Sequence, residues 1–159
     1  MTDLSTFLQP AIALMIWTMV MWAWMYATRI PAMQKANVDP NALARDPDAS
    51  LDRTLPARVQ WKAHNYNHLH EQPTVFYAVM FTLALTGGAT DANAFLAWIY
   101  TGLRVIHSVV QVTANRVTVR FVLFALSSIV LIALIVKAAL TVFGSAPNLE
   151  GMELDPTAV

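Results

Sequence analysis

The stretch that decides the fold is residues 7–28, FLQPAIALMIWTMVMWAWMYAT, which contains no charged side chain. A helix needs about 20 mostly apolar residues to cross the hydrocarbon core of a bilayer. The stretch is too long for the apolar region of a signal peptide, and no basic segment precedes it. Residues 7–28 therefore predict a first membrane span.

Three further apolar runs have the length of membrane spans: residues 58–86, 92–113 and 118–143. The connections between the last three runs are short, which requires neighbouring helices to be antiparallel. The whole chain is 57% hydrophobic and 13% charged, whereas a soluble domain is about 25% charged. We therefore predict an all-α fold, an integral membrane antiparallel four-helix bundle.

The segments outside the apolar cores are expected to differ in structure. The connection 29–55 is long, polar and rich in proline, and we expect irregular structure there with one short helix. The second span begins with a polar half, and Pro73 is expected to kink it. Residues 1–144 then form the membrane domain, and the acidic residues 145–159 form a mobile tail.

Charge placement predicts the orientation in the membrane. Eight of the ten Lys and Arg residues fall in or beside the first and third connections. By the positive-inside rule these connections are cytoplasmic, and both termini lie on the other side, as in a bacterial inner-membrane protein. The formal net charge is zero, which gives no basic surface for nucleic acid, and the absence of cysteine excludes disulfides and a cysteine nucleophile.

Polar side chains at membrane depth form two stripes at helical spacing. The stripes are His64, Asn67, His68 and Glu71 in the second span, and Tyr100, Arg104, His107 and Gln111 in the third. Ionisable groups at this depth require partners or a water-filled cavity. Two stripes on adjacent antiparallel helices can face one cavity, so these residues predict a buried polar site.

Two other interpretations of the stripes remain open at this point. In the first, the polar groups only pair with one another and fix the packing of the helices. In the second, His64, His68 and Glu71 present a helical face of metal ligands, because histidines four residues apart lie on one side of a helix. His70 points to the opposite side of that helix and is interpreted as a packing residue.

A family resemblance rests on residues of all four helices. Asn67 and Glu71 are followed by Pro73, the third helix carries an Arg-x-x-His motif in AWIYTGLRVIHSVVQ (residues 97–111), and Arg120 opens the fourth. This arrangement resembles the MAPEG family, the membrane-associated proteins in eicosanoid and glutathione metabolism. The resemblance covers residues 7–143.

The resemblance implies a homotrimer that binds glutathione between subunits and acts on a lipophilic electrophile or hydroperoxide from the bilayer. It assigns Arg120 as the catalytic residue that stabilises the thiolate, Glu71 as the partner of the glutathione ammonium, and Arg29 as the partner of a carboxylate. The full set of expected glutathione-binding residues is Arg29, His64, Asn67, His68, Glu71, Arg104, His107, Gln111 and Arg116.

The chain departs from the family pattern at several of these positions. His64, Asn67 and His68 stand where catalytic members carry Arg, Arg and Asn, and Gln111 and Phe121 stand where members carry a tyrosine and a serine. No hydroxyl remains at either usual place to hydrogen-bond a thiolate. A non-catalytic membrane protein with a structural polar stripe is therefore the alternative to a glutathione transferase or peroxidase.

Overall fold

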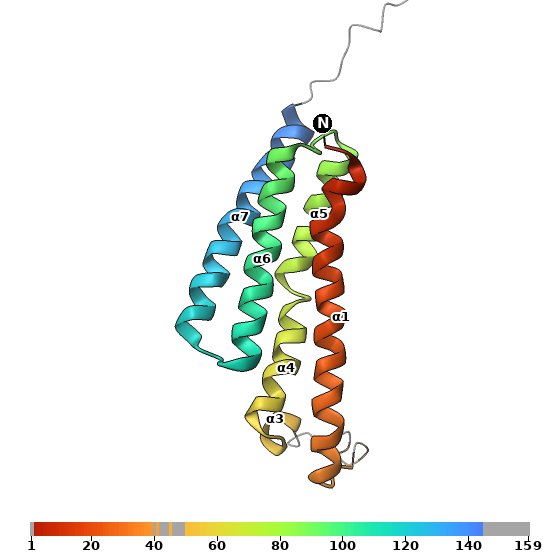
Figure 1. Ribbon diagram of the computed structural model, residues 1–159, viewed down its shortest axis with the longest axis vertical. Coiled ribbons are helices and arrows are strands. Elements are labelled where there is room, and N and C mark those ends of the chain that lie inside the picture. Colours follow the sequence, from red (N-terminus) through yellow and green to blue (C-terminus); the bar gives the residue numbers. More distant parts are fainter. Residues whose placement is uncertain (1, 40, 42–44, 46–49, 145–159) are drawn as a thin grey trace, which may run out of the picture.

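The computed structural model describes residues 2–39, 41, 45 and 50–144, and these residues form helices and no strand (Figure 1). The helices are α1 (Leu4–Lys35), α3 (Leu51–Thr54), α4 (Ala57–His68), α5 (Gln72–Leu85), α6 (Asp91–Thr113) and α7 (Val117–Gly144). Except for the short α3, they run along one long axis as a bundle. The prediction of an all-α fold is confirmed.

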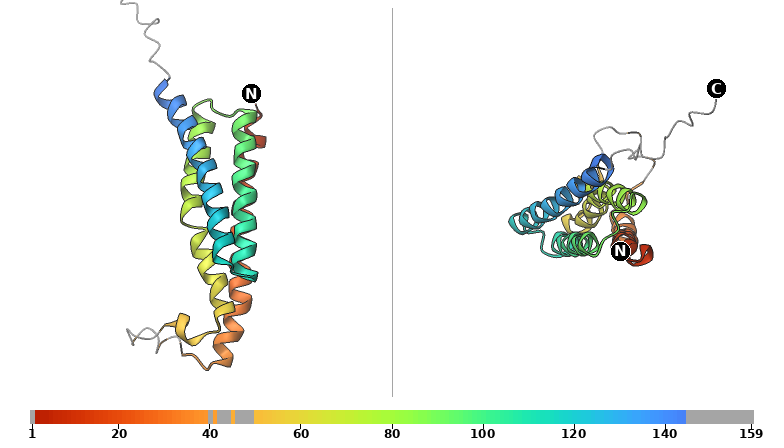
Figure 2. Two further views of the ribbon diagram at one scale, coloured as in Figure 1. Left: turned by 90° about the vertical axis from the view of Figure 1, so that its left-hand side faces the viewer. Right: turned by 90° about the horizontal axis from the view of Figure 1, so that it is seen from above.

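Three helices are long and apolar enough to cross a membrane: α1, α6 and α7. The turn between α6 and α7 is short, and the two helices run antiparallel (Figure 1). Viewed along the bundle, α6 packs against both α1 and α7, and α5 also contacts both (Figure 2). Helices of this length and polarity are typical of an integral membrane protein.

The second predicted span is not one continuous helix. It is divided into α4, which ends at His68, and α5, which begins at Gln72. Pro73 lies in the first turn of α5, and inside a longer helix its ring would clash with the carbonyl of Leu69. The expected kink at Pro73 is therefore a break at residues 69–71, and the polar stripe predicted in the second span does not lie on one helix.

The first helix extends farther than predicted. It continues through Arg29 and Pro31 to Lys35, so the beginning of the predicted irregular connection is helical. The expected short helix is α3, which Ser50 caps by accepting a hydrogen bond from the Asp52 N–H. The predicted mobile tail, residues 145–159, lies outside the described residues.

The core fills the space between α1, α5, α6 and α7. Its fully buried side chains include Phe7 and Leu14 from α1, Phe76 from α5 and Leu134 from α7. The ring of Phe76 stacks on that of Tyr100 in α6, with the centroids 4.3 Å apart. At bilayer depth the packing of such side chains and the polar contacts between helices hold the bundle together.

A buried polar layer joins α4 to α6. The Asn65 amide donates a hydrogen bond to Gln111 Oε1 at 3.0 Å, and the Ser108 hydroxyl donates to Asn65 Oδ1. All three side chains are at most 3% exposed. Because the surroundings offer no water, each partner lost from this layer leaves another polar group unsatisfied.

We predict that Gln111→Leu lowers the free energy of unfolding by about 1–3 kcal/mol, because the Asn65 amide then has no acceptor. The double variant Asn65→Leu, Gln111→Leu should cost less than the sum of the single variants. Thermal or denaturant unfolding in detergent measures this coupling. Additive effects of the two substitutions would contradict the proposed layer.

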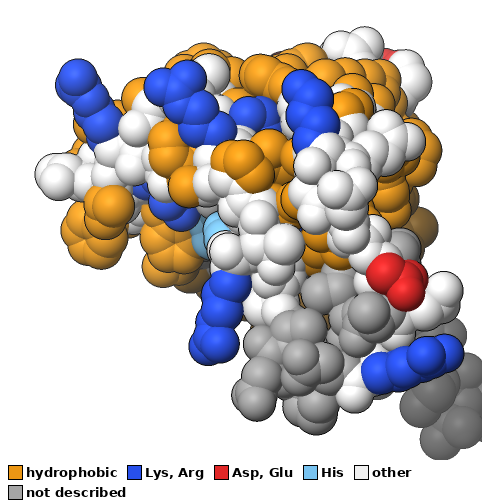
Figure 3. Space-filling model, turned by 90° about the horizontal axis from the view of Figure 1, so that it is seen from below, with side chains coloured by type: hydrophobic (Ala, Val, Ile, Leu, Met, Phe, Trp, Pro, Cys, Tyr) orange, Lys and Arg blue, Asp and Glu red, His pale blue; other side chains and the backbone are white. Residues whose placement is uncertain are grey.

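Basic side chains gather at one end of the bundle. This end carries the last turn of α1, α3 and the turn between α6 and α7 (Figure 3). The opposite end carries the N-terminus and the turn between α5 and α6 (Figure 1). The basic bias read from the sequence is thus a property of one end of the structure.

The chain has no cysteine, so single cysteines can report which end is cytoplasmic. We predict that Lys35→Cys and Val117→Cys react only with a membrane-impermeant maleimide supplied from the cytoplasmic side. Thr86→Cys, at the other end, should react only from outside. Reversed labelling would overturn the orientation.

Candidate functional site

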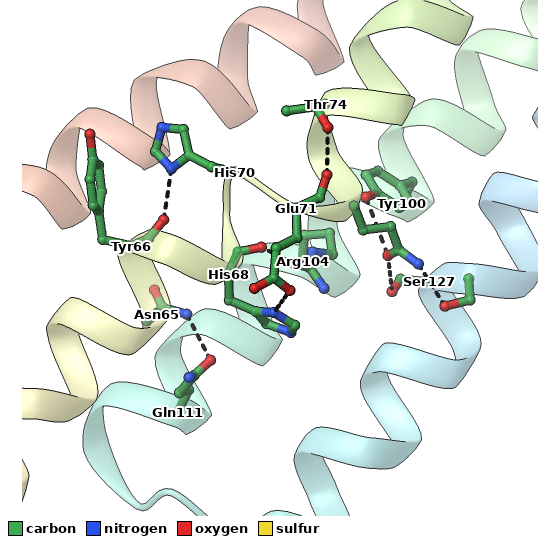
Figure 4. A network of polar contacts seen from close by, with 12 residues as sticks. Asn65, Tyr66, His68, His70, Glu71, Thr74, Tyr100, Arg104, Gln111 and Ser127 are labelled. Carbon is green, nitrogen blue, oxygen red and sulfur yellow. Dashed lines mark hydrogen bonds and ion pairs between the residues drawn. The ribbon is translucent and has the colours of Figure 1, made fainter.

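The break between α4 and α5 is the centre of the candidate site. His68 Nδ1 lies 2.6 Å from Glu71 Oε2, and the Arg104 Nη2 group donates a hydrogen bond to the His68 carbonyl at 3.0 Å (Figure 4). The last carbonyls of a helix have no partner within it, so a guanidinium from α6 can satisfy one of them here. The break leaves the His68 carbonyl free for Arg104, so the side chains of His68, Glu71 and Arg104 meet there.

Arg104 carries more hydrogen-bond donors than the described residues use. Its residue is 1% exposed, and its Nε and Nη1 atoms are buried without a partner among the described residues. The guanidinium carbon lies 5.9 Å from the centre of the Phe124 ring. A buried guanidinium with free N–H groups favours an anionic ligand, because an unpaired buried charge is costly.

A pocket of about 220 Å³ opens between the break, α6 and α7. The residues that line it are His68, His107, Val117, Arg120, Phe121 and Phe124. Arg120 donates from Nη1 to Asn115 Oδ1 at 2.6 Å, which directs its guanidinium, while its Nε is buried and has no partner among the described residues. The pocket thus combines two imidazoles, a guanidinium and aromatic walls.

The imidazole of His68 is held between aromatic and polar neighbours. Its ring stacks on Phe124 at 5.7 Å and lies 5.2 Å from the ring of His107. Glu71 fixes the orientation of the ring through Nδ1, as Figure 4 shows. The side chains of His68, His107 and Arg120 therefore line one small space.

Five of the predicted site residues are brought together: His68, Glu71, Arg104, His107 and Arg120. Gln111 is buried on the same helix face, but its amide oxygen accepts the hydrogen bond from Asn65.

The structure separates the other predicted site residues from this pocket. His64 bonds to Asp52 at 3.1 Å and is half-exposed. Asn67 and Arg116 are exposed and do not line the pocket. Arg29 lies on α1, and its buried Nε has no partner among the described residues. The single chain does not bring these residues to the pocket.

The three side chains of the metal interpretation do not form a cluster in the structure. No group of three His, Cys, Asp or Glu side chains able to hold a metal occurs among the residues the structure describes. His64, which the interpretation needs, bonds to Asp52 although it shares α4 with His68.

One polar residue of the site region was missed by sequence reasoning. Gln72, the first residue of α5, donates to the Ser128 hydroxyl at 2.7 Å and accepts from the hydroxyls of Tyr100 and Ser127, both at 3.4 Å. It ties α5 to α6 and α7. A glutamine beside a proline at membrane depth was the signal for this contact.

Comparison with known proteins places the chain in a family. A sequence model of the MAPEG family matches residues 7–140, which run from the first turn of α1 to the last part of α7. No curated protein and no solved structure shows a significant match to the chain. Because the matched region includes nearly all of the described helices and every residue of the pocket, the protein belongs to the MAPEG family.

Proposed function

We propose that the protein binds glutathione at the break between α4 and α5 and transfers it to a lipophilic electrophile, or uses it to reduce a lipophilic hydroperoxide, that arrives from the bilayer. The family is named for eicosanoid and glutathione metabolism, and its match supports this class of ligand. Arg104, His107 and Glu71 are the proposed anchors of the tripeptide, and Arg120 is the proposed catalytic residue.

The observation that carries the proposal is the set of free guanidinium N–H groups at the site. Arg104 Nε and Nη1 and Arg120 Nε are buried without partners in the described part of the chain. Glutathione carries two carboxylates and an ionisable thiol, and charge-assisted hydrogen bonds to such groups are the strong ones. An anionic thiol therefore supplies the partners that these donors lack.

Arg120 is suited to stabilising a thiolate. A free cysteine-type thiol has a pKa of about 8.5, and a cation beside it in a poorly solvated site lowers that pKa. Arg120 lines the pocket together with Phe121 and Phe124, whose rings make part of its wall apolar. The same aromatic side chains offer an apolar surface to a substrate from the lipid.

A homotrimer as the functional assembly is supported by the cost of exposing a polar side chain at membrane depth. The Glu71 side chain is 64% exposed in the single chain, although it belongs to the second membrane span. A carboxylate facing lipid is costly, and a neighbouring subunit with its bound ligand would cover it. Residues such as Arg29 and Asn67, which one chain holds apart from the pocket, would reach it from the next subunit.

The alternative, a non-catalytic protein with a structural polar stripe, also has an observation in its favour. The layer of Asn65, Ser108 and Gln111 is fully used in hydrogen bonds between α4 and α6. That layer explains part of the stripe by packing alone. It does not explain the unpartnered nitrogen atoms of Arg104 and Arg120.

We predict that glutathione raises the thermal unfolding midpoint of the detergent-solubilised protein, because a ligand of the native state stabilises it by mass action. Glutathione disulfide and unrelated dicarboxylates should have smaller effects. A midpoint that does not move with glutathione concentration would contradict the proposed ligand.

We predict that Arg120→Gln raises the pKa of the bound thiol by about one to two and lowers turnover at neutral pH about ten- to a hundredfold, because the thiolate loses a charge-assisted hydrogen bond. Ultraviolet absorbance of the thiolate against pH and steady-state kinetics measure the two effects. Arg58→Gln, an exposed arginine in the first turn of α4, is the matched control and should leave both unchanged.

We predict that native mass spectrometry in a mild detergent shows three copies of the chain, since a single copy leaves Glu71 uncovered. A species that stays monomeric in every detergent that preserves folding would remove the proposed contribution of neighbouring subunits.

A further inference from the structure

His68 has the geometry of a general base, a role that the proposed function has so far not used. It is the last residue of α4, and its Nδ1 is 2.6 Å from Glu71 Oε2. A carboxylate at one ring nitrogen takes the N–H there and leaves the other nitrogen, Nε2, as a proton acceptor. The ring lines the pocket that also contains Arg120, so an acceptor nitrogen and a thiolate-stabilising cation border one space.

The remaining pocket residues offer no comparable base. Val117, Phe121 and Phe124 have no titratable group, and an arginine such as Arg120 stays protonated. The hydroxyls that serve other members of the family are replaced by Gln111 and Phe121, and the Gln111 amide is held by Asn65.

His107 is the rival base, and its partners differ from those of His68. Among the described residues it forms no ion pair with a carboxylate, whereas Glu71 can balance the charge of a protonated His68. A general base needs this balance at the moment it accepts the proton, and the carboxylate of a Ser-His-Asp triad does the same for its histidine. The geometry therefore favours His68.

The charged and titratable groups that face His68 are few. Glu71 comes from the break itself, Arg104 and His107 come from α6, and Arg120 comes from α7. On the α1 side of the break, the lining residues from α1 are Met15, Thr18 and Met19, none of which titrates near neutral pH.

We propose that His68, oriented and charge-balanced by Glu71, is the general base that takes the proton of the bound thiol. This inference rests on the proposed function, because it needs a thiol in the pocket. The S–H bond breaks, its proton passes to His68 Nε2, and the electron pair remains on sulfur beside Arg120. When the thiolate adds to an α,β-unsaturated ketone, the S–C bond forms and the proton on Nε2 returns to the resulting enolate, so the base is regenerated.

The assignment leaves Glu71 able to serve the tripeptide as well. His68 uses Oε2, and the other carboxylate oxygen, Oε1, can accept a hydrogen bond from the glutathione ammonium. Glu71 is then a positioning residue for His68 and an anchor for the ligand. The two roles are separable by measurement. Positioning of His68 affects the pH dependence of the rate, whereas the contact with the ammonium affects the affinity for glutathione.

The test compares His68→Gln and Glu71→Gln with the parent in the full-length protein in detergent. The control is His70→Gln, the same substitution two positions away, because His70 bonds through Nδ1 to the Tyr66 carbonyl and lies outside the pocket. The measurements are kcat/KM against pH with glutathione and a lipophilic α,β-unsaturated ketone, and the shift of the thermal midpoint by glutathione.

We expect His68→Gln to lower kcat/KM at neutral pH about a hundredfold or more, the size of a general-base contribution. The part of the pH profile that depends on His68 should disappear, and activity should return as pH approaches the pKa of the free thiol. Glutathione should still raise the midpoint of this variant. Glu71→Gln should reduce both the rate and the glutathione effect, and His70→Gln neither.

A His68→Gln variant within about threefold of the parent and with an unchanged pH profile would overturn the base assignment and leave the proposed function intact. A loss of kcat/KM of the expected size in His70→Gln would also overturn the base assignment, because the loss would then come from a disturbance of the whole break. If glutathione does not stabilise the parent protein and the parent shows no glutathione-dependent turnover, the proposed function is overturned, and the inference with it.

Discussion

The structure depends on one steric constraint, the ring of Pro73. A proline removes a backbone N–H and collides with the carbonyl four residues earlier, so α4 cannot pass through Leu69 into α5. The backbone groups freed by the break must find partners within the bundle, because the bilayer interior supplies no water. The guanidinium of Arg104 supplies one of them by donating to the His68 carbonyl. A buried cation thus lies at the break for a structural reason, and its unused N–H groups remain available to a ligand.

Much of the fold was predictable from the sequence, because length and polarity decide whether a segment can cross a bilayer. The uncharged run in α1 and the apolar α7 both have the length and polarity of a membrane span. The break was anticipated only as a kink, because a proline indicates a disturbance of the helix but not its extent. The extension of α1 past Pro31 was missed because a polar, proline-bearing segment resembles a loop.

The candidate site was predictable in part from helical spacing. Arg104 and His107 lie on α6, and the spacing of three residues placed both on its buried face: His107 lines the pocket, and Arg104 donates to the His68 carbonyl beside it. His64 was assigned to the same site as His68 on the assumption that one helix carries the stripe to Glu71. Its actual partner, Asp52, comes from α3 in a connection whose path no periodicity reveals. Contacts between chain segments, such as those of Gln72 with α6 and α7, likewise depend on packing that helical spacing does not encode.

The helix α7 packs against the bundle on one side only, and this affects the stability of the pocket. This helix rests on α6 and α5, and most of its length faces outward. Yet it supplies Arg120, Phe121 and Phe124, one whole wall of the pocket. Segments with few buried contacts open at the lowest free energy, ahead of global unfolding. The local stability of α7, which depends on the lipid against its outward face, therefore affects the fraction of molecules whose pocket is closed. A change of lipid composition would alter the population of an open state without any contact to the residues that line the pocket.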